Sequence, residues 1–236
     1  MTVEIKPLCA FKDNYVWCVR QSAIMPWVVI DPGEAAPVMT LLGEQPPAAI
    51  LLTHHHNDHI GGVAVLRERY HAPIYGPADI AEIDHPLKGG EKLSLAGLSF
   101  HVFATPGHTL DHLCYELEGE HPALFSGDTL FSGGSGRLFE GTAEQLFKSF
   151  RQFDALPDET MLCPGHEYTQ GNLKFIASLG QDSPAFQARV AEVARLREAG
   201  RPSVPVTLGV ERQTNPFLTA PSVEALAQLR QQKDQF

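Results

Sequence analysis

Cysteine is scarce in this chain: its 236 residues include 4 cysteines, and no two of them form a Cys-x-x-Cys pair. We therefore expect free thiols of a reducing compartment, rather than a disulfide framework, at Cys9, Cys18, Cys114 and Cys163. Long hydrophobic runs are missing as well. The run at residues 25–30 is interrupted by Pro26 and is far too short to span a membrane.

The N-terminal segment has an acidic Glu4 and lacks the long apolar core of a secretory signal. There is also no excess of positive charge, because 18 lysines and arginines face 28 acidic residues and the formal net charge is −10. A nucleic-acid partner usually requires a basic stripe. We expect a soluble, cytoplasmic monomer that binds neither nucleic acid nor a membrane.

Histidine, by contrast, is concentrated in one place: residues 53–62 read Thr-His-His-His-Asn-Asp-His-Ile-Gly-Gly. Neutral imidazoles and carboxylates are ligands that zinc, iron and manganese accept. The apolar run at 48–53 precedes the cluster, and residues 60–70 have helical spacing. We therefore expect the cluster on the turn after a buried strand, at the carboxyl edge of a sheet. A zincin helix would instead need two histidines at i and i+4 with a glutamate between them.

Within this cluster, His54 and His56 point the same way in an extended segment. Asp58 and His59 lie past the bend and can face a second position. His55 points away from the pair, and we do not expect it to be a ligand.

Three later stretches each place one ligand-type residue in a tight turn after an apolar run: Thr-Pro-Gly-His-Thr (105–109), Leu-Phe-Ser-Gly-Asp-Thr (124–129) and Cys-Pro-Gly-His-Glu-Tyr (163–168). They supply His108, Asp128 and His166. One three-nitrogen site then consists of His54, His56 and His108, and the other site consists of Asp58, His59 and His166. Asp128 has two carboxylate oxygens and can bridge the two.

A chain with these motifs resembles the metallo-β-lactamase-fold hydrolases, whose His-x-His-x-Asp-His signature is present at 54–59. Within that superfamily it is similar to the glyoxalase II family of hydroxyacylglutathione hydrolases. The narrower resemblance rests on Ser-Gly-Asp-Thr-Leu-Phe (126–131), Gly-Arg-Leu-Phe-Glu-Gly-Thr (136–142), Gly-His-Glu-Tyr-Thr (165–169), Asn-Leu-Lys-Phe (172–175), Asn-Pro-Phe-Leu (215–218) and Lys-Asp-Gln-Phe (233–236).

The resemblance implies an α/β fold, a four-layer αββα sandwich with a small helical C-terminal domain. We expect a catalytic domain at residues 1–166 and a helical substrate-binding domain at 167–236. It also implies substrate contacts, which we expect at Arg137, Phe139, Tyr168, Asn172, Arg230 and Lys233. Two departures from the family pattern stand out: Ser135 replaces a common cysteine, and Phe139 replaces a tyrosine that contacts glutathione in some relatives.

The implied reaction is hydrolysis of an S-(2-hydroxyacyl)glutathione, with S-D-lactoylglutathione as the expected substrate, to D-lactate and glutathione in methylglyoxal detoxification. Two divalent ions, zinc first and iron or manganese as alternatives, would generate a bridging hydroxide beside Asp58. The alternatives are a persulfide dioxygenase with one iron, a nuclease or lactonase of the same fold, and a non-catalytic metal-binding scaffold.

Several residues can have either a structural or a functional role. We expect a structural or surface role for His71, His85, His101, His112 and His121. Asp31, before Pro32-Gly33, is either a plain turn residue or an acceptor that orients a ligand histidine. Arg230 and Lys233 lie at i and i+3 on one predicted helix, and we expect both to face solvent.

Short β-type runs alternate with helical patterns up to His166, which predicts sheets covered by helices. Beyond Tyr168 the sequence predicts helices at 172–179, 184–199 and 223–232. Residues 201–216, with three prolines, read as an irregular connector.

Overall fold

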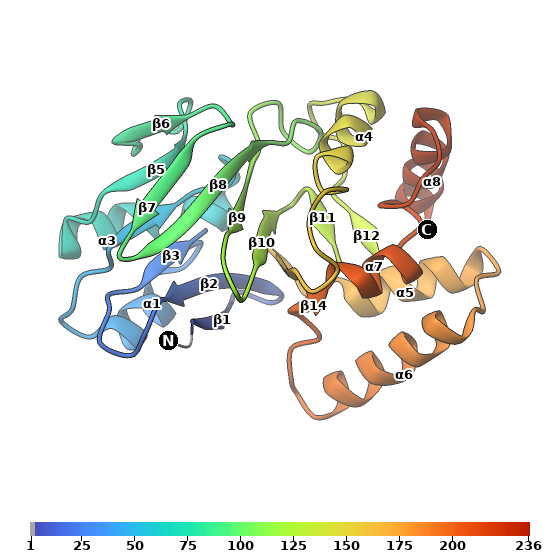
Figure 1. Cartoon of the computed structure of the whole chain (residues 1–236), viewed down its shortest axis with the longest axis horizontal. Helices are drawn as coiled ribbons and strands as arrows, with labels where there is room; N and C mark the ends of the chain where they lie inside the picture. Colours follow the sequence, from blue (N-terminus) through green and yellow to red (C-terminus); the bar gives the residue numbers. More distant parts are fainter. Residues whose placement is uncertain (1–2) are drawn as a thin grey trace.

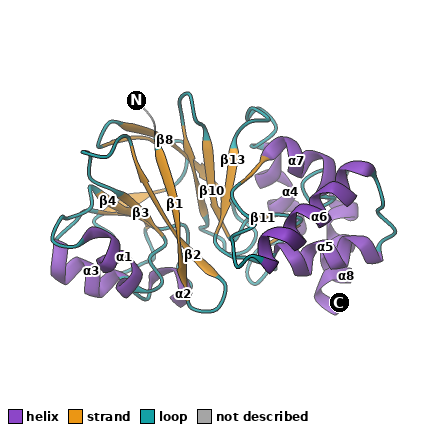
Figure 2. Cartoon of the chain, turned by 90° about the horizontal axis from the view of Figure 1, so that it is seen from below, coloured by secondary structure: helices purple, strands orange, loops and turns teal. Residues whose placement is uncertain are grey.

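Two six-stranded sheets face each other at the centre of the molecule, and helices lie outside them (Figures 1 and 2). The structure is a computed structural model and describes residues 3–236. Helices α4 to α8 gather on one side, next to the second sheet, and α1 and α3 cover the first (Figure 2). The predicted α/β class, with helix-covered sheets and a helical C-terminal region, is confirmed.

The first sheet contains the N-terminal strands in sequence order. These are β1 (Glu4–Ala10), β2 (Asn14–Arg20), β3 (Val28–Ile30), β4 (Ala49–Leu51), β5 (Ile74–Pro77) and β6 (His85–Leu87). The first three strands pair antiparallel, and β3 to β6 pair parallel. Because the parallel strands run the same way, their carboxyl ends reach one common edge.

The second sheet has the order β14-β13-β10-β9-β8-β7. In chain order its strands are β7 (Lys92–Leu95), β8 (Leu98–Ala104), β9 (Leu113–Leu117), β10 (Ala123–Gly127), β13 (Met161–Pro164) and β14 (Val206–Thr207). Strands β10 and β13 are parallel neighbours, so the turns that follow them also meet at one edge. A small two-stranded sheet, β11 (Leu130–Phe131) and β12 (Gly134–Ser135), follows β10.

The alternation of side chains along the strands divides the core into two parts. On β2, Trp17 and Val19 belong to the larger cluster, which also contains the side chains of the second sheet. Val16 and Cys18 belong to a second cluster beneath α1 (Ala35–Leu42) and α3 (Val63–Tyr70). Both faces of this strand are therefore buried, as expected for an inner layer of a sandwich.

Helices follow the predicted pattern near the histidine cluster with one difference. The helical spacing of residues 60–70 is divided between α2 (Asn57–Ile60) and α3, with Gly61 and Gly62 between them. A Cβ on Gly62 would lie 2.5 Å from the Pro32 carbonyl oxygen, so the chain turns where only glycine fits against its neighbour.

The C-terminal helices begin and end close to their predicted bounds: α5 (Thr169–Ser178), α6 (Pro184–Glu198) and α8 (Val223–Gln235). The prediction of an irregular connector at 201–216 is wrong. That segment contains β14 and α7 (Leu208–Thr214), and β14 pairs antiparallel with β13 as the last strand of the second sheet. Its strand has two residues, too short to leave a period-2 signal in the sequence.

Within residues 3–236, none of the helices combines the length and the apolar character that crossing a membrane requires.

Candidate metal centre and adjoining cavity

The seven predicted ligands lie where strands end. Residues 54–59 follow β4 and enter α2, His108 follows β8, Asp128 follows β10, and His166 follows β13. These four strands belong to two different sheets, and hydrogen bonds from β2 link the two sheets. The amide of Tyr15 donates to the Gly165 carbonyl at 2.8 Å, and Trp17 Nε1 donates to the Pro164 carbonyl at 2.8 Å. The first sheet is thus tied to the turn that carries His166.

Three imidazoles form the first group of close ligand atoms. Nδ1 of His56 lies 3.0 Å from Nε2 of His54 and 3.0 Å from Nε2 of His108. The three nitrogens lie within 4.8 Å of one another. The structure therefore brings together the residues predicted for the three-nitrogen site.

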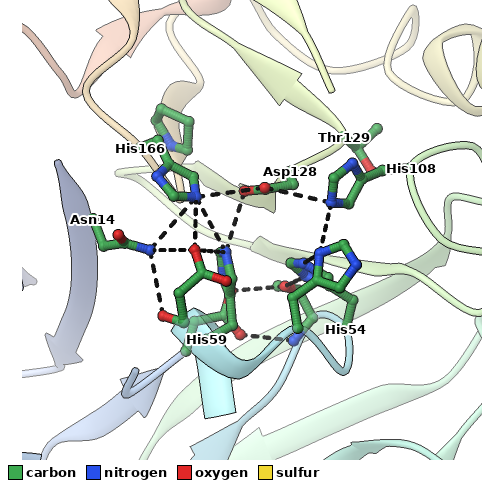
Figure 3. Close-up of polar contacts among 12 residues, drawn as sticks. Asn14, His54, His59, His108, Asp128, Thr129 and His166 are labelled. Carbon is green, nitrogen blue, oxygen red and sulfur yellow. Dashed lines mark hydrogen bonds and ion pairs between the residues drawn. The ribbon is translucent and has the colours of Figure 1, made fainter. Parts of the chain in front are cut away.

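The second group combines two imidazoles with a carboxylate (Figure 3). Nε2 of His166 lies 3.3 Å from Nε2 of His59 and 3.3 Å from Oδ2 of Asp58. The Asp58 side chain is 44% exposed, so this carboxylate of the group reaches solvent.

Asp128 lies between the two groups. Its Oδ2 is 3.5 Å from Nε2 of His108 and 3.5 Å from Nε2 of His166, and its Oδ1 is 3.4 Å from Nε2 of His59. Close packing holds it there. A Cβ on Gly165 would lie 2.7 Å from Asp128 Oδ1, so the turn after β13 presses directly against the carboxylate.

The second nitrogen of four of these imidazoles has an acceptor of its own. Nδ1 of His54 faces Thr53 Oγ1 at 2.9 Å, and Nδ1 of His108 faces the Arg137 carbonyl at 2.8 Å. Nδ1 of His59 faces Asp31 Oδ2 and Nδ1 of His166 faces Asp13 Oδ1, at 3.0 and 2.9 Å. An acceptor at Nδ1 keeps the proton there and leaves the Nε2 lone pair free to coordinate a cation.

Divalent cations fit this arrangement. Lone pairs of neighbouring imidazoles converge at 3.0 Å, and the buried Asp128 Oδ1 has no hydrogen-bond donor among the described residues. A buried carboxylate oxygen without a partner is costly, and a cation removes that cost. The mixture of imidazole nitrogen and carboxylate oxygen suits zinc, iron and manganese.

The carboxylates around the second group also favour a bound cation. Burial alone would lower the pKa of His166, but the carboxylates of Asp128, Asp58 and Asp13 raise that pKa to about 11. Burial would raise the pKa of Asp128, yet His59 and His166 hold it well below its usual range. The carboxylates stay ionised, and a cation bound here takes over the role of the proton on His166.

Asp31 holds two of the predicted ligand histidines in place, so it is more than a plain turn residue. Its side chain is 3% exposed and accepts from the Thr53 amide at 2.8 Å and the Thr53 hydroxyl at 2.7 Å, besides His59. Since the Thr53 hydroxyl donates to Asp31, it accepts from His54 Nδ1. One carboxylate therefore fixes His59 directly and His54 through Thr53.

The remaining histidines lie outside the two groups, as predicted. His55 points away and pairs with acidic side chains: Asp79 at 3.1 Å, Asp111 at 3.6 Å and Glu140 at 3.2 Å. His112 is buried and structural, and its Nε2 accepts from the Asp128 amide at 3.1 Å. It thereby supports the backbone of the shared carboxylate.

Sequence reasoning missed two adjacent residues, Asp13 at the end of the turn after β1 and Asn14 at the start of β2. Asp13 accepts from His166. Asn14 lies beside His166 (Figure 3), and its Nδ2 donates to Asp58 Oδ2 at 2.9 Å. The available signal was that an Asp-Asn pair follows a strand, but such pairs are also ordinary turn formers.

A cavity of about 320 Å³ adjoins the metal centre, with His108 and Asp128 in its wall. It is also lined by all six predicted substrate contacts, Arg137, Phe139, Tyr168, Asn172, Arg230 and Lys233. Two exposed aromatic rings flank two of the predicted ligands, His108 and His166. Phe139 lies edge-on to His108, with ring centroids 5.2 Å apart, and Tyr168 stacks on His166 at 4.5 Å.

Three cationic side chains are part of the same lining: Arg137, Arg230 and Lys233. The prediction that both α8 cations face solvent is wrong for Arg230, whose side chain is 7% exposed. Arg230 donates to the Ser135 carbonyl at 2.9 Å, and its guanidinium carbon lies 5.4 Å from the centre of the Phe217 ring. Lys233 is half-buried, with its Nζ 5.2 Å from the centre of the Phe175 ring and 3.3 Å from the Gly171 carbonyl.

Comparisons with known proteins agree with these features. The family model of the metallo-β-lactamase superfamily matches residues 25–166, and that of the hydroxyacylglutathione hydrolase C-terminus matches residues 167–236. A hydroxyacylglutathione hydrolase of Chromohalobacter salexigens is 47% identical over 220 residues, covering 92% of this chain and 86% of that protein.

Solved structures share the fold. The ETHE1 protein of Myxococcus xanthus has a TM-score of 0.72 and 26% identity, over 97% of this chain and 90% of that chain. A protein crystallised in a di-iron-bound form has a TM-score of 0.61 and 28% identity, over 91% of this chain and 99% of that chain.

Proposed function

This chain belongs to the hydroxyacylglutathione hydrolases of the metallo-β-lactamase superfamily, and we propose that it hydrolyses S-(2-hydroxyacyl)glutathiones at two divalent metal ions. The observation that carries the proposal is a single cavity. It is lined both by His108 and Asp128 of the candidate metal centre and by three cationic side chains, Arg137, Arg230 and Lys233. A thioester whose thiol portion bears carboxylates matches that combination.

We propose that one ion binds His54, His56 and His108, the other binds Asp58, His59 and His166, and Asp128 bridges them. Bound divalent ions would supply Lewis-acid polarisation of the thioester carbonyl and lower the pKa of water to about 7. Zinc is the first choice, with iron or manganese as alternatives.

Asp58 is the proposed catalytic carboxylate among the protein groups. Its side chain is 44% exposed and would face the attacking water, whereas Asp128 is buried. Asn14 donates to Asp58 Oδ2 and limits the rotation of the carboxylate. The leaving group is a thiolate whose conjugate acid has a pKa of about 8.5, so it departs without a strong general acid.

The thiol portion of the substrate would extend along the cavity toward α8. Glutathione has two carboxylates, and Arg137, Arg230 and Lys233 offer opposite charge. Asn172, Tyr168 and Phe139 would contact the part of the glutathione molecule that lies between its carboxylates and the thioester. On this view residues 1–166 form the catalytic domain and residues 167–236 the substrate-binding domain.

The deciding experiment uses purified protein reconstituted with zinc, iron or manganese. Loss of the thioester of S-D-lactoylglutathione is followed, and the metal content of the same sample is measured. We expect hydrolysis to D-lactate and glutathione with two ions per chain. A plateau at one iron, with oxygen consumption on a glutathione persulfide, would instead identify a persulfide dioxygenase. Two bound ions without activity on any thioester, lactone or nucleic acid would identify a metal-binding scaffold.

A further inference from the structure

A carboxylate lies among the cationic side chains that line the cavity. Asp234, in the last turn of α8, lines the cavity together with Arg137, Arg230 and Lys233. Its Oδ1 accepts from Arg137 Nε at 3.2 Å and also from Arg230 Nη2. A negative charge here opposes the binding of an anionic ligand, so its position requires a compensating role.

The two arginines come from different parts of the fold. Arg230 is buried on α8, and its other amino group, Nη1, donates to the Ser135 carbonyl. Arg137 follows β12, and its side chain is 57% exposed. Its backbone carbonyl accepts from the proposed metal ligand His108. The backbone of Arg137 is thus fixed relative to the metal centre, whereas its long side chain depends on Asp234 for a defined orientation.

We propose that Asp234 is a positioning residue for substrate recognition, which holds Arg137 and Arg230 together so that both receive one carboxylate of the substrate. The inference rests on the proposed function, because it assumes an anionic thiol portion in this cavity. Ordering a free arginine side chain on binding costs conformational entropy. Asp234 imposes that order before the substrate arrives, and preorganisation of this kind strengthens binding.

The direction in which substrate affinity changes in an Asp234 variant distinguishes a positioning role from a purely electrostatic one. Asp234→Asn removes a negative charge from the cavity with almost no change in shape. If Asp234 acts only as a like charge, the variant should bind the anionic substrate more tightly. If it positions the arginines, the variant should bind more weakly, although the cavity has become more positive.

The experiment compares the zinc-reconstituted wild type with Asp234→Asn and Asp234→Ala. The substrates are S-D-lactoylglutathione and the lactoyl thioester of γ-glutamylcysteine, which lacks glycine and carries its terminal carboxylate one residue closer to the thioester. We expect KM for the glutathione thioester to rise roughly three- to tenfold, as for loss of a charge-assisted contact, with kcat little changed. KM for the shorter thioester should stay at the wild-type value. Asp182 is an exposed carboxylate between α5 and α6. The control variant Asp182→Asn makes the same charge change away from the cavity, and it should have no effect on KM.

A KM for the glutathione thioester that falls or stays unchanged would overturn the proposal. So would an equal rise for both thioesters, since that indicates a general displacement of α8. Glutathione binding, measured by calorimetry, gives a readout that needs no turnover, and we expect weaker binding by both Asp234 variants. If the wild type hydrolyses neither thioester, the proposed function fails. Unchanged glutathione affinity in the Asp234 variants contradicts the positioning role alone.

Discussion

Asp31→Asn should weaken the binding of one metal ion far more than that of the other. Asp31 has a φ of 52°, and asparagine tolerates this left-handed conformation, so the backbone is not strained by the change. Oδ1 of the new amide can still accept from the Thr53 amide. The amide nitrogen then replaces Oδ2, the atom that accepts from Thr53 Oγ1 and from His59 Nδ1.

A donor at that position forces His59 to accept at Nδ1 and to hold its proton at Nε2. Nε2 is the atom that lies 3.3 Å from His166 Nε2 and 3.4 Å from Asp128 Oδ1, so the proton blocks coordination. Loss of such an outer contact costs about 10- to 100-fold in metal affinity. At about 1.4 kcal/mol per tenfold, this corresponds to roughly 1.4 to 2.8 kcal/mol. His54 is linked to Asp31 only through Thr53, so the other ion should lose less.

The assay is metal titration in competition with a chromophoric chelator, with folding checked by urea denaturation. Asp84→Asn is the matched control: Asp84 accepts from the Ile74 amide at 3.0 Å and pairs with Arg67, away from the metal centre. The control should bind both ions like the wild type. If Asp31→Asn also binds both ions with wild-type affinity, the assignment of the His59 proton is wrong. An equal loss at both sites would also contradict the reasoning.

Three further changes test other parts of the molecule. Asp128→Ala should weaken both ions in the same titration, because its oxygens lie 3.4 to 3.5 Å from nitrogens of both groups, and selective loss of one ion would contradict a bridge. Lys233→Ala should raise KM by the equivalent of about 0.5 to 1 kcal/mol, less in high salt, with kcat retained. A KM rise indifferent to salt would indicate lost packing on the aromatic rings instead. Glu211→Ala removes a fully buried carboxylate that accepts three hydrogen bonds, and the free energy of unfolding in urea should fall by about 2 to 4 kcal/mol. A loss no larger than that of exposed Glu198→Ala would contradict this role.

The grouping of the ligand-type residues could be predicted because each one follows a strand. A ligand-type residue in a tight turn after an apolar run is a local pattern, and parallel strands bring their carboxyl ends together. His108 and His166 could therefore be grouped with residues 54–59 across long stretches of sequence. Their role as ligands is proposed on the same basis and awaits the metal titrations.

The sequence could not predict contacts between segments that lie far apart in the chain. Helical spacing places Arg230 and Lys233 on one face of α8, but it does not say that Arg230 packs against Ser135 and Phe217 and is buried there. Asp13 and Asn14 lie 153 and 44 residues from the side chains they contact, and their own neighbours suggest only a turn. A cytoplasmic location and a monomeric state stay predictions.

The pairing of β14 with β13 has a consequence for synthesis on the ribosome. The residues proposed to bind metal all lie before residue 167, so they emerge while the last third of the chain is still being made. Until residues 206–207 emerge and pair with Met161 and Leu162, the hydrogen-bonding edge of β13 is open. An open edge invites pairing with another chain, so a nascent or prematurely terminated product ending near residue 166 would be prone to aggregate.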